Sequence, residues 1–276
     1  MADVTLTAAL RSNLLSLQGT QALLNQTQLR IATGLKVNSA LDNPSSFFAA
    51  QSLNNRAGDL SNLLDGMGQA IQTLKAADQG ITAITKFLEQ AQSIAQQALD
   101  SLNAGASTAS TASLGASFNS TLTQSDNLAA DSGYRGTNLL SGAVSQTVTF
   151  SETAAPSTLS ITGYDLKTGG DLTVVATGGT FTIAAATTAI AAIKADLATI
   201  RADASQLGTN LSIIQTRQDF TQNLINTLKE GADKLVVADK NEEGAKLLAL
   251  QTTQQLGITS LSLASQANQS ILRLFQ

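Results

Sequence analysis

Apolar residues recur every seven positions along most of the chain, the repeat expected where long helices pack against one another. In the cleanest run, one apolar position is kept for six heptads and a second follows it three residues later. Those positions are held by Leu60, Met67, Leu74, Ile81, Leu88, Ala95 and Leu102, and by Leu63, Ala70, Ala77, Ile84, Ala91 and Ala98. An unbroken two-position seam predicts one helix over about residues 45–103.

Four other segments show a helical period. The first has apolar residues at Leu10, Leu17, Leu24 and Ile31, and we expect this helix to end near residue 40. A shorter helix is predicted over 114–129. A long helix over about 190–228 has its seam at Ile193, Ile200, Leu207 and Ile214. The last, over about 241–274, is apolar at Leu247, Leu250, Leu256, Leu261, Ala264, Ile271 and Phe275.

The period changes between the third and fourth helices. Four short runs are rich in β-branched and aromatic residues and are separated by Gly and Pro, at 147–150, 159–162, 172–175 and 181–183. They predict one or two hairpins within region 145–184, which is too short to build a core of its own. The predicted fold is therefore mainly α, a long antiparallel coiled-coil bundle with a small inserted β-hairpin region.

Local chemistry marks the start of the longest helix. Asn43 precedes Pro44, and an Asn N-cap followed by Pro at the first helical position is a common way for a helix to begin. We therefore expect a short connector between the first two helices, ending at Asn43.

Composition removes most enzymatic chemistry. The 276 residues include no His and no Cys, which excludes a Ser-His-Asp triad, a thiolate nucleophile and the usual zinc sites. The net charge is −4, with only 13% charged residues, so no basic surface for nucleic acid is expected. The first residues lack the basic and apolar regions of a secretory signal. Since no run reaches 18 apolar residues, no membrane span is expected.

Two motifs could suggest a site. Gly66-Met67-Gly68 has no strand before it and no Lys-Ser/Thr after it, so we interpret it as helix packing rather than a phosphate loop. Asp239, Glu242 and Glu243 precede the last helix, where acids favour a helix N-terminus. As catalytic carboxylates they would need a pocket, which the predicted architecture does not offer. We expect no catalytic residue, cofactor or metal.

The two ends of the chain are almost free of charge. Only Asp3, Arg11 and Arg30 are charged among the first 35 residues, and none is charged from 247 to 272. A solvated amphipathic helix normally carries charge on its wet face, whereas these carry Gln, Asn, Ser and Thr. Such uncharged faces suit packing among identical copies, because a charged side chain on this face could meet the same charge on the next copy and be repelled. The alternative is a monomeric helical bundle with a polar surface.

Four stretches, spread over nearly the whole chain, resemble bacterial flagellins. Residues 31–42 (IATGLKVNSALD) resemble the family's N-terminal signature, and 256–275 resemble its C-terminal signature. Residues 134–142 (YRGTNLLSG) are similar to the loop before the hairpin, and 215–220 (QTRQDF) lie in the matching part of the descending helix. The family usually has two acids followed by small residues after Asn-Ser-Ala. Here Asn43 stands in place of the second acid, and Pro44 follows it.

The resemblance implies a structural, non-enzymatic subunit that polymerises into the flagellar filament used for swimming. It implies a coiled-coil domain of 1–40 with 237–276 lining the filament channel, and an outer helical domain of 41–236 with little variable insert. It further implies secretion by the flagellar type III export apparatus, an export chaperone, and contacts with cap and hook–filament junction proteins. The expected location is the extracellular filament.

The resemblance also assigns residues. The polymerisation seam would be formed by Leu10, Leu17, Leu24, Ile31, Leu250, Leu256, Leu261, Ala264, Ile271 and Phe275. The outer helical seam would be formed by Leu60, Met67, Leu74, Ile81, Leu88, Ile193, Ile200, Leu207 and Ile214. Segment 88–96 resembles the one by which flagellins engage Toll-like receptor 5, but Gln90 and Ser93 replace a basic and an acidic residue, so we expect weak recognition.

Two other functions share some of these features. A hook–filament junction protein has the same terminal signatures but forms one short ring, and the compact middle of this chain favours the filament subunit. A soluble helical binding module would share the heptads but would form no polymer.

Overall fold

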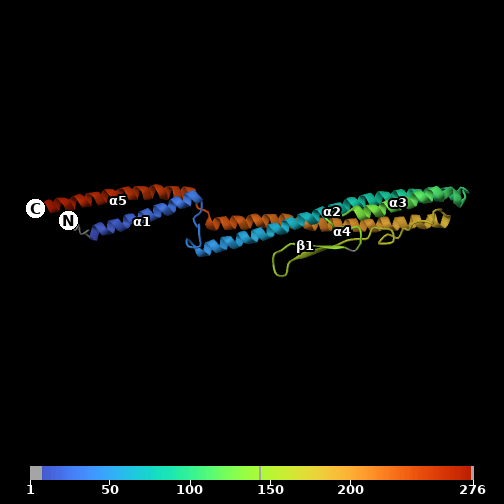
Figure 1. Ribbon diagram of the computed structural model, residues 1–276, viewed down its shortest axis with the longest axis horizontal. Helices are drawn as coiled ribbons and strands as arrows, with labels where there is room; N and C mark the ends of the chain where they lie inside the picture. The colour runs from blue at the N-terminus through green and yellow to red at the C-terminus, as the bar shows by residue number, and fades with distance from the viewer. Residues whose placement is uncertain (1–7, 143, 275–276) are drawn as a thin grey trace. The chain divides into compact units, whose positions relative to one another are not determined.

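The computed structural model describes residues 8–142 and 144–274 (Figure 1). It is mainly helical, which confirms the predicted fold class. The helices are α1 (Ala8–Thr33), α2 (Pro44–Asn103), the short 3-10 helix η1 (Thr108–Thr111), α3 (Ala112–Asp131), α4 (Ile183–Val236) and α5 (Lys240–Leu274). One two-stranded antiparallel sheet pairs β1 (Ser145–Thr149) with β2 (Thr158–Thr162).

The chain divides into two compact units, which are described separately here. The terminal unit consists of Met1–Arg56 with Thr227–Gln276, and the central unit consists of Ala57–Asn226. The terminal unit contains α1 and α5, and the central unit contains α3, the β-hairpin and most of α2 and α4.

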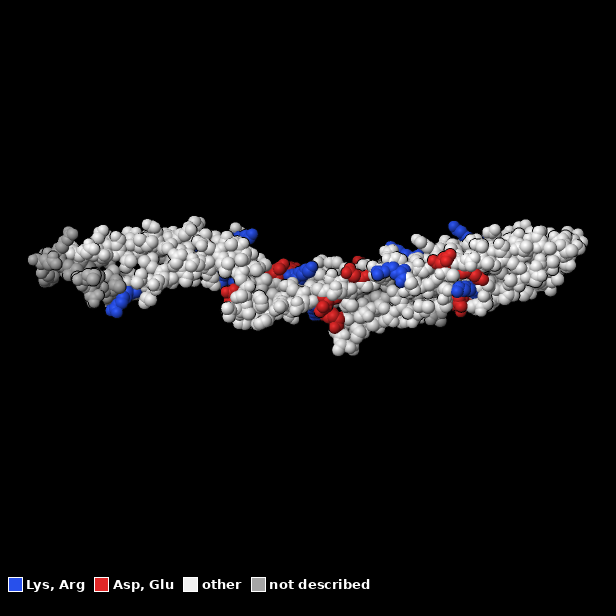
Figure 2. All heavy atoms as spheres, in the orientation of Figure 1, with Lys and Arg blue, Asp and Glu red and all other residues white. Residues whose placement is uncertain are grey.

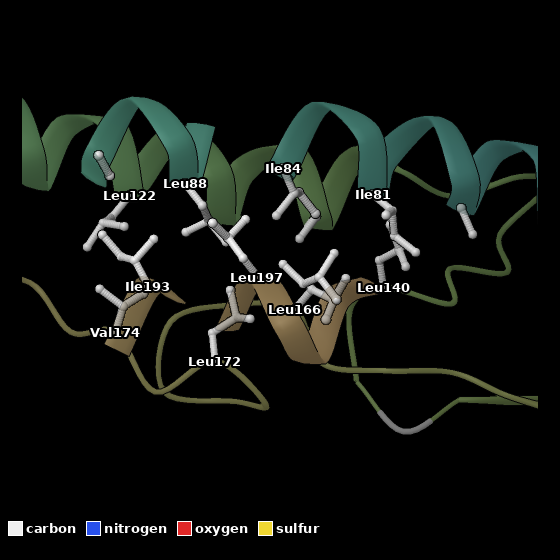
Figure 3. Close-up of a cluster of buried hydrophobic side chains, with 14 of the residues drawn as sticks. Ile81, Ile84, Leu88, Leu122, Leu140, Leu166, Leu172, Val174, Ile193 and Leu197 are labelled. Carbon is white, nitrogen blue, oxygen red and sulfur yellow. The ribbon is translucent and has the colours of Figure 1, made fainter. Parts of the chain in front are cut away.

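A single hydrophobic core runs through the central unit. It joins buried side chains of α2, α3, α4 and the loops around the hairpin, as the facing side chains in Figure 3 show. Ile84 and Leu88 of α2, Phe118 of α3 and Ile193 of α4 have no exposed surface. Region 145–184 adds its apolar residues to this shared core, as expected for an insert too small to have its own.

Only the first two of the four β-prone runs form strands. The backbone of run 172–175 is held by a side chain instead, because the carboxylate of Asp196 accepts hydrogen bonds from the N–H groups of Thr173 (2.8 Å) and Val174 (2.9 Å). The N–H of Phe181 donates to the hydroxyl of Thr111 at 3.0 Å, and α4 already begins at Ile183. These side chains occupy backbone groups that a neighbouring strand would otherwise have paired.

The helix boundaries around the connector agree with the sequence at one end and not at the other. The predicted N-cap is confirmed, since Oδ1 of Asn43 accepts a hydrogen bond from the N–H of Ser46 at 3.1 Å and α2 begins at Pro44. The prediction that the first helix reaches residue 40 is wrong. The helix stops at Thr33 because Gly34 takes a left-handed conformation (φ +73°).

Among the described residues, α4 is the one helix long and apolar enough to cross a membrane, with a mean hydropathy of 1.5 over 18 residues. No membrane span was expected from the sequence, because no unbroken run of 18 apolar residues occurs in it. Ile193, Ile200 and Ile214 of this helix are buried in the core of the central unit.

Candidate assembly surface on the terminal helices

Helices α1 and α5 pair antiparallel along a heptad seam. Gln21 receives a 2.6 Å hydrogen bond from Gln254, and Arg30 forms a 3.2 Å ion pair with Glu243 nearer the connector. Of the predicted polymerisation seam, Leu10 and Leu24 are buried, and the half-buried members are Leu17, Ile31, Leu250, Leu261 and Ala264. These residues therefore pair the two ends of one chain. The side chain of Ile271 and the whole of Phe275 lie outside the described residues.

Polar and small residues that were not predicted from the sequence complete the seam. Thr20 and Thr27 are buried on α1. On α5, a Cβ added to Gly257 would lie 2.6 Å from Cδ2 of Leu17, so the glycine leaves room for that leucine. Gly257 lies seven residues after Leu250 and seven before Ala264, and its register was the available signal. A seam with these members buries less apolar surface than the leucine seam of the central unit.

The acidic residues at the start of α5 are structural. Oδ1 of Asp239 caps the helix by accepting a 2.8 Å hydrogen bond from the N–H of Asn241. Glu243 pairs with Arg30, and Lys246 lies 2.7 Å from Glu242. A cavity of about 400 Å³ does lie beside them, contrary to the expectation of no pocket. Its acids are matched by basic side chains, and the described residues include no cluster of three metal-ligating side chains.

The outer faces of α1 and α5 expose large apolar side chains. The exposed fractions exceed half for most of a set formed by Leu14, Leu15, Leu23 and Leu29 of α1 and Leu248, Leu256, Ile258 and Leu263 of α5. Leu256 is 66% exposed and therefore belongs to this outer set, not to the intrachain seam. The visible face of both helices is almost wholly uncharged in Figure 2. This many large apolar side chains exposed on an uncharged surface indicate a binding partner.

The predicted outer helical seam lies inside the central unit. Its nine residues are at most 4% exposed: Leu60, Met67, Leu74, Ile81, Leu88, Ile193, Ile200, Leu207 and Ile214. Gln90 and Ser93 are exposed on α2. The structure therefore separates buried packing positions, paired apolar ends and exposed positions available to other molecules.

A stripe of polar residues on α4, which was not predicted from the sequence, contacts the hairpin region. The stripe repeats every seven residues, at Asp196, Asp203, Asn210 and Arg217. Asp196, which is 1% exposed, holds residues 173–174 as described above. The guanidinium of Arg217 lies over the ring of Phe150, 5.4 Å from its centroid. The signal was the spacing, which places these residues beside the apolar seam.

Asp203 is the member of this stripe whose carboxylate is not fully hydrogen-bonded. It is 9% exposed, and within the described part of the chain its buried Oδ2 has no hydrogen-bond partner. Burial raises the pKa of its carboxyl, and the nearby charge of Asp171 raises that pKa further. The ionised form is therefore unfavourable in the folded protein.

Replacing Asp203 by Asn should stabilise the central unit at neutral pH. An acid whose pKa is raised on folding binds its proton more tightly when folded, so wild-type stability rises as pH falls from neutral towards the unfolded value of about 4. Relieving a buried unpaired charge should increase the free energy of unfolding by about 1 kcal/mol, which is about 2–4 °C in Tm. Thermal unfolding from pH 8 to pH 4 measures this, and a gain that persists undiminished at pH 4 would contradict it.

Comparison with known proteins identifies the family. The bacterial flagellin N-terminal helical region matches residues 5–145, and the bacterial flagellin C-terminal helical region matches residues 190–275. Flagellin FljM of Caulobacter vibrioides is 33% identical over 261 residues, which cover 95% of this chain and 94% of that protein. A flagellin of Brucella melitensis is 31% identical, and the comparison covers 100% of both chains.

Among solved structures, the crystal structure of Bacillus cereus flagellin is similar, with a TM-score of 0.45 and 19% identity over 55% of this chain and 86% of that one. The two family regions lie at the two ends of the chain, where the terminal signatures were found, and the relatives are matched over nearly their full length. This chain therefore belongs to the bacterial flagellin family.

Proposed function

We infer that this protein is a structural subunit of the bacterial flagellar filament, the extracellular part of the flagellum. The observation that carries this function is the set of exposed leucines on the uncharged faces of α1 and α5. The family supports the same function, because its members are filament subunits. The role requires packing surfaces and no catalytic chemistry.

The terminal helices would act in two steps. Their shared seam pairs the two ends within each chain, and their outer leucines then pack against neighbouring copies. A contact between different surfaces of identical subunits need not close into a ring, so it can extend into a helical filament. In this proposal 1–40 and 237–276 line the filament channel, while 41–236 form the outer domain. Because this domain has almost no variable insert, the filament is thin and relatively smooth.

The absence of charge on these helices fits the polymer. A charged side chain in a repeated contact would meet the same charge of the next copy or lose its water without a partner. Gln, Ser and Thr side chains can instead donate and accept hydrogen bonds with any neighbour. Before assembly, the free chain exposes this apolar surface to solvent. A chaperone that covers the C-terminal segment before type III export would shield it. Cap and hook–filament junction proteins would contact the finished ends.

A seeded sedimentation assay tests the filament function. Purified chain is mixed with sheared filament fragments, and the pellet is examined by electron microscopy. The expected result is growth of filaments from the seeds. A chain that stays in the supernatant under every seeding condition is a soluble binding module instead. Filaments sheared from cells should consist largely of this chain, whereas a trace amount would indicate the junction protein.

Weak activation of Toll-like receptor 5 is a separate expectation. Gln90 and Ser93 are exposed on α2 and uncharged, so they cannot form ion pairs with a receptor that binds a basic and an acidic residue at these two positions. Replacing Gln90 by Arg and Ser93 by Glu should increase receptor activation by endotoxin-free monomer. A potent response to the unmodified chain would contradict this expectation.

A further inference from the structure

A charged residue occupies one position of the seam between α1 and α5. On α5 this position recurs every seven residues, and Leu250, Gly257 and Ala264 fill three of its repeats. Glu243 lies seven residues before Leu250 and therefore fills the same position near the start of the helix. It is only 4% exposed. A carboxylate at a buried heptad position costs stability, but a polar residue of this kind can select one register of a coiled coil.

Arg30 of α1 is the partner of this carboxylate. Its guanidinium lies 3.2 Å from Oε1 of Glu243, while Lys246, on the same helix as Glu243, lies 3.6 Å from that oxygen. Oε2 of Glu243 is buried and has no hydrogen-bond partner among the described residues. A backbone hydrogen bond of 2.9 Å, from the N–H of Ala238 to the carbonyl of Gly34, closes the same end of the seam. The contact of the carboxylate with a charge on the other helix therefore depends on Arg30.

The apolar part of the seam is compatible with more than one alignment. In the observed alignment Leu17 lies against Gly257, as described above. A shift of α1 by one heptad is about 10 Å along the helix axis, and it would place Leu17 opposite Leu250 or Ala264, which are also apolar. Connector 34–43 has ten residues outside the helices, which is enough chain to follow such a shift. The heptads alone therefore distinguish weakly between these alignments.

Arg30 can meet an acid of α5 in one alignment only. The acids of this helix are Glu242 and Glu243, and no residue from 247 to 272 is charged. A shift of one heptad in one direction would place Arg30 opposite Leu250, and a shift in the other direction would place it beyond the first residue of α5. In both cases the buried carboxylate would lose its partner on α1, which is strongly unfavourable.

We propose that the ion pair between Arg30 and Glu243 sets the register of the terminal coiled coil. It selects one alignment of α1 and α5 from those that their apolar heptads permit. The two residues are positioning residues within a single chain, so this role goes beyond the proposed filament function. A single alignment gives every copy of the chain the same outer surface on these helices.

Engineered disulfides report the alignment, because the chain has no Cys of its own. Three full-length chains combine Leu17→Cys with Gly257→Cys, Leu250→Cys or Ala264→Cys. Each is equilibrated in a glutathione buffer, where the oxidised fraction measures how close the two thiols lie. The 17–257 pair should form its disulfide about tenfold more readily than the 17–250 and 17–264 pairs. Equal oxidation of the three pairs would overturn the proposal.

Reversing a charge separates the ion pair from the other contacts at this end of the seam. Arg30→Glu should lower the preference for the 17–257 pair about tenfold, and adding Glu243→Arg should restore it by exchanging the two charges. The matched control is Lys234→Glu, which reverses one charge of the exposed pair Lys234–Glu230 within α4 and should leave the preference unchanged.

Three outcomes would each overturn the proposal: an unchanged preference in Arg30→Glu, no recovery when the charges are exchanged, or an equal loss in Lys234→Glu. None of them bears on the filament function, because the disulfides are measured in the free chain and seeded sedimentation decides that function separately.

Discussion

A Leu261→Asp variant is expected to remain in the supernatant under seeding conditions that pellet the wild type. Leu261 is half-buried in the seam between α5 and α1, and no basic residue occurs from 247 to 272. Burying a carboxylate without a partner costs several kcal/mol. In the proposed assembly α5 pairs with α1 before its outer leucines meet another copy, so that cost would fall on every subunit of the polymer. Seeded sedimentation measures the loss.

Two further variants separate a packing effect from a general loss of folding. Leu261→Met keeps apolar volume and should polymerise nearly as the wild type does. A chain lacking 257–276 should also fail to polymerise, yet the helices of the central unit should keep their circular dichroism and unfolding transition. Filaments of normal yield from Leu261→Asp would show that the α1–α5 seam is not needed for assembly.

The heptads were sufficient to predict the central seam because each repeat carries the same local signal. Leu74 and Ile193 were assigned to packing positions from spacing alone, and both are buried. The N-cap at Asn43 was equally local, since it depends on two adjacent residues. Where a helix or its cap is encoded within one or two turns, the sequence contained enough information.

The strands predicted at 172–175 and 181–183 show where local signals end. Their composition favours β structure, but their backbone N–H groups donate hydrogen bonds to the side chains of Asp196 and Thr111, which lie elsewhere in the sequence. The prediction of Leu256 as a seam residue was wrong for another reason: it lies one residue before the heptad position held by Gly257, and it is 66% exposed. The heptad register of one helix does not specify which molecule covers such an exposed apolar residue.

A glycine inside a helix shows the difference between a local preference and a contact with a distant segment. Gly115→Ala is expected to destabilise the central unit. In an open helical position Gly to Ala stabilises by about 1 kcal/mol. At Gly115 the added Cβ would lie 2.5 Å from the carbonyl oxygen of Gly179, a backbone atom that cannot rotate away. Such overpacking costs about 1–3 kcal/mol, so the free energy of unfolding should fall despite the better helix former.

The matched control is Gly66→Ala on α2, where an added Cβ has no atom of the described structure within 4 Å. It should raise Tm by about 2–4 °C, the shift expected for 1 kcal/mol in a unit of this size. Gly115→Ala should lower Tm, and it should also loosen the hydrogen bonds between Asn119 and Thr177, which hydrogen exchange at residue 177 reports. If both variants gained stability, Gly115 and the backbone of Gly179 would not be in close contact. Opposite signs from one chemical change would show that the second residue, Gly179, decides the outcome, because helix propensity is the same at both positions.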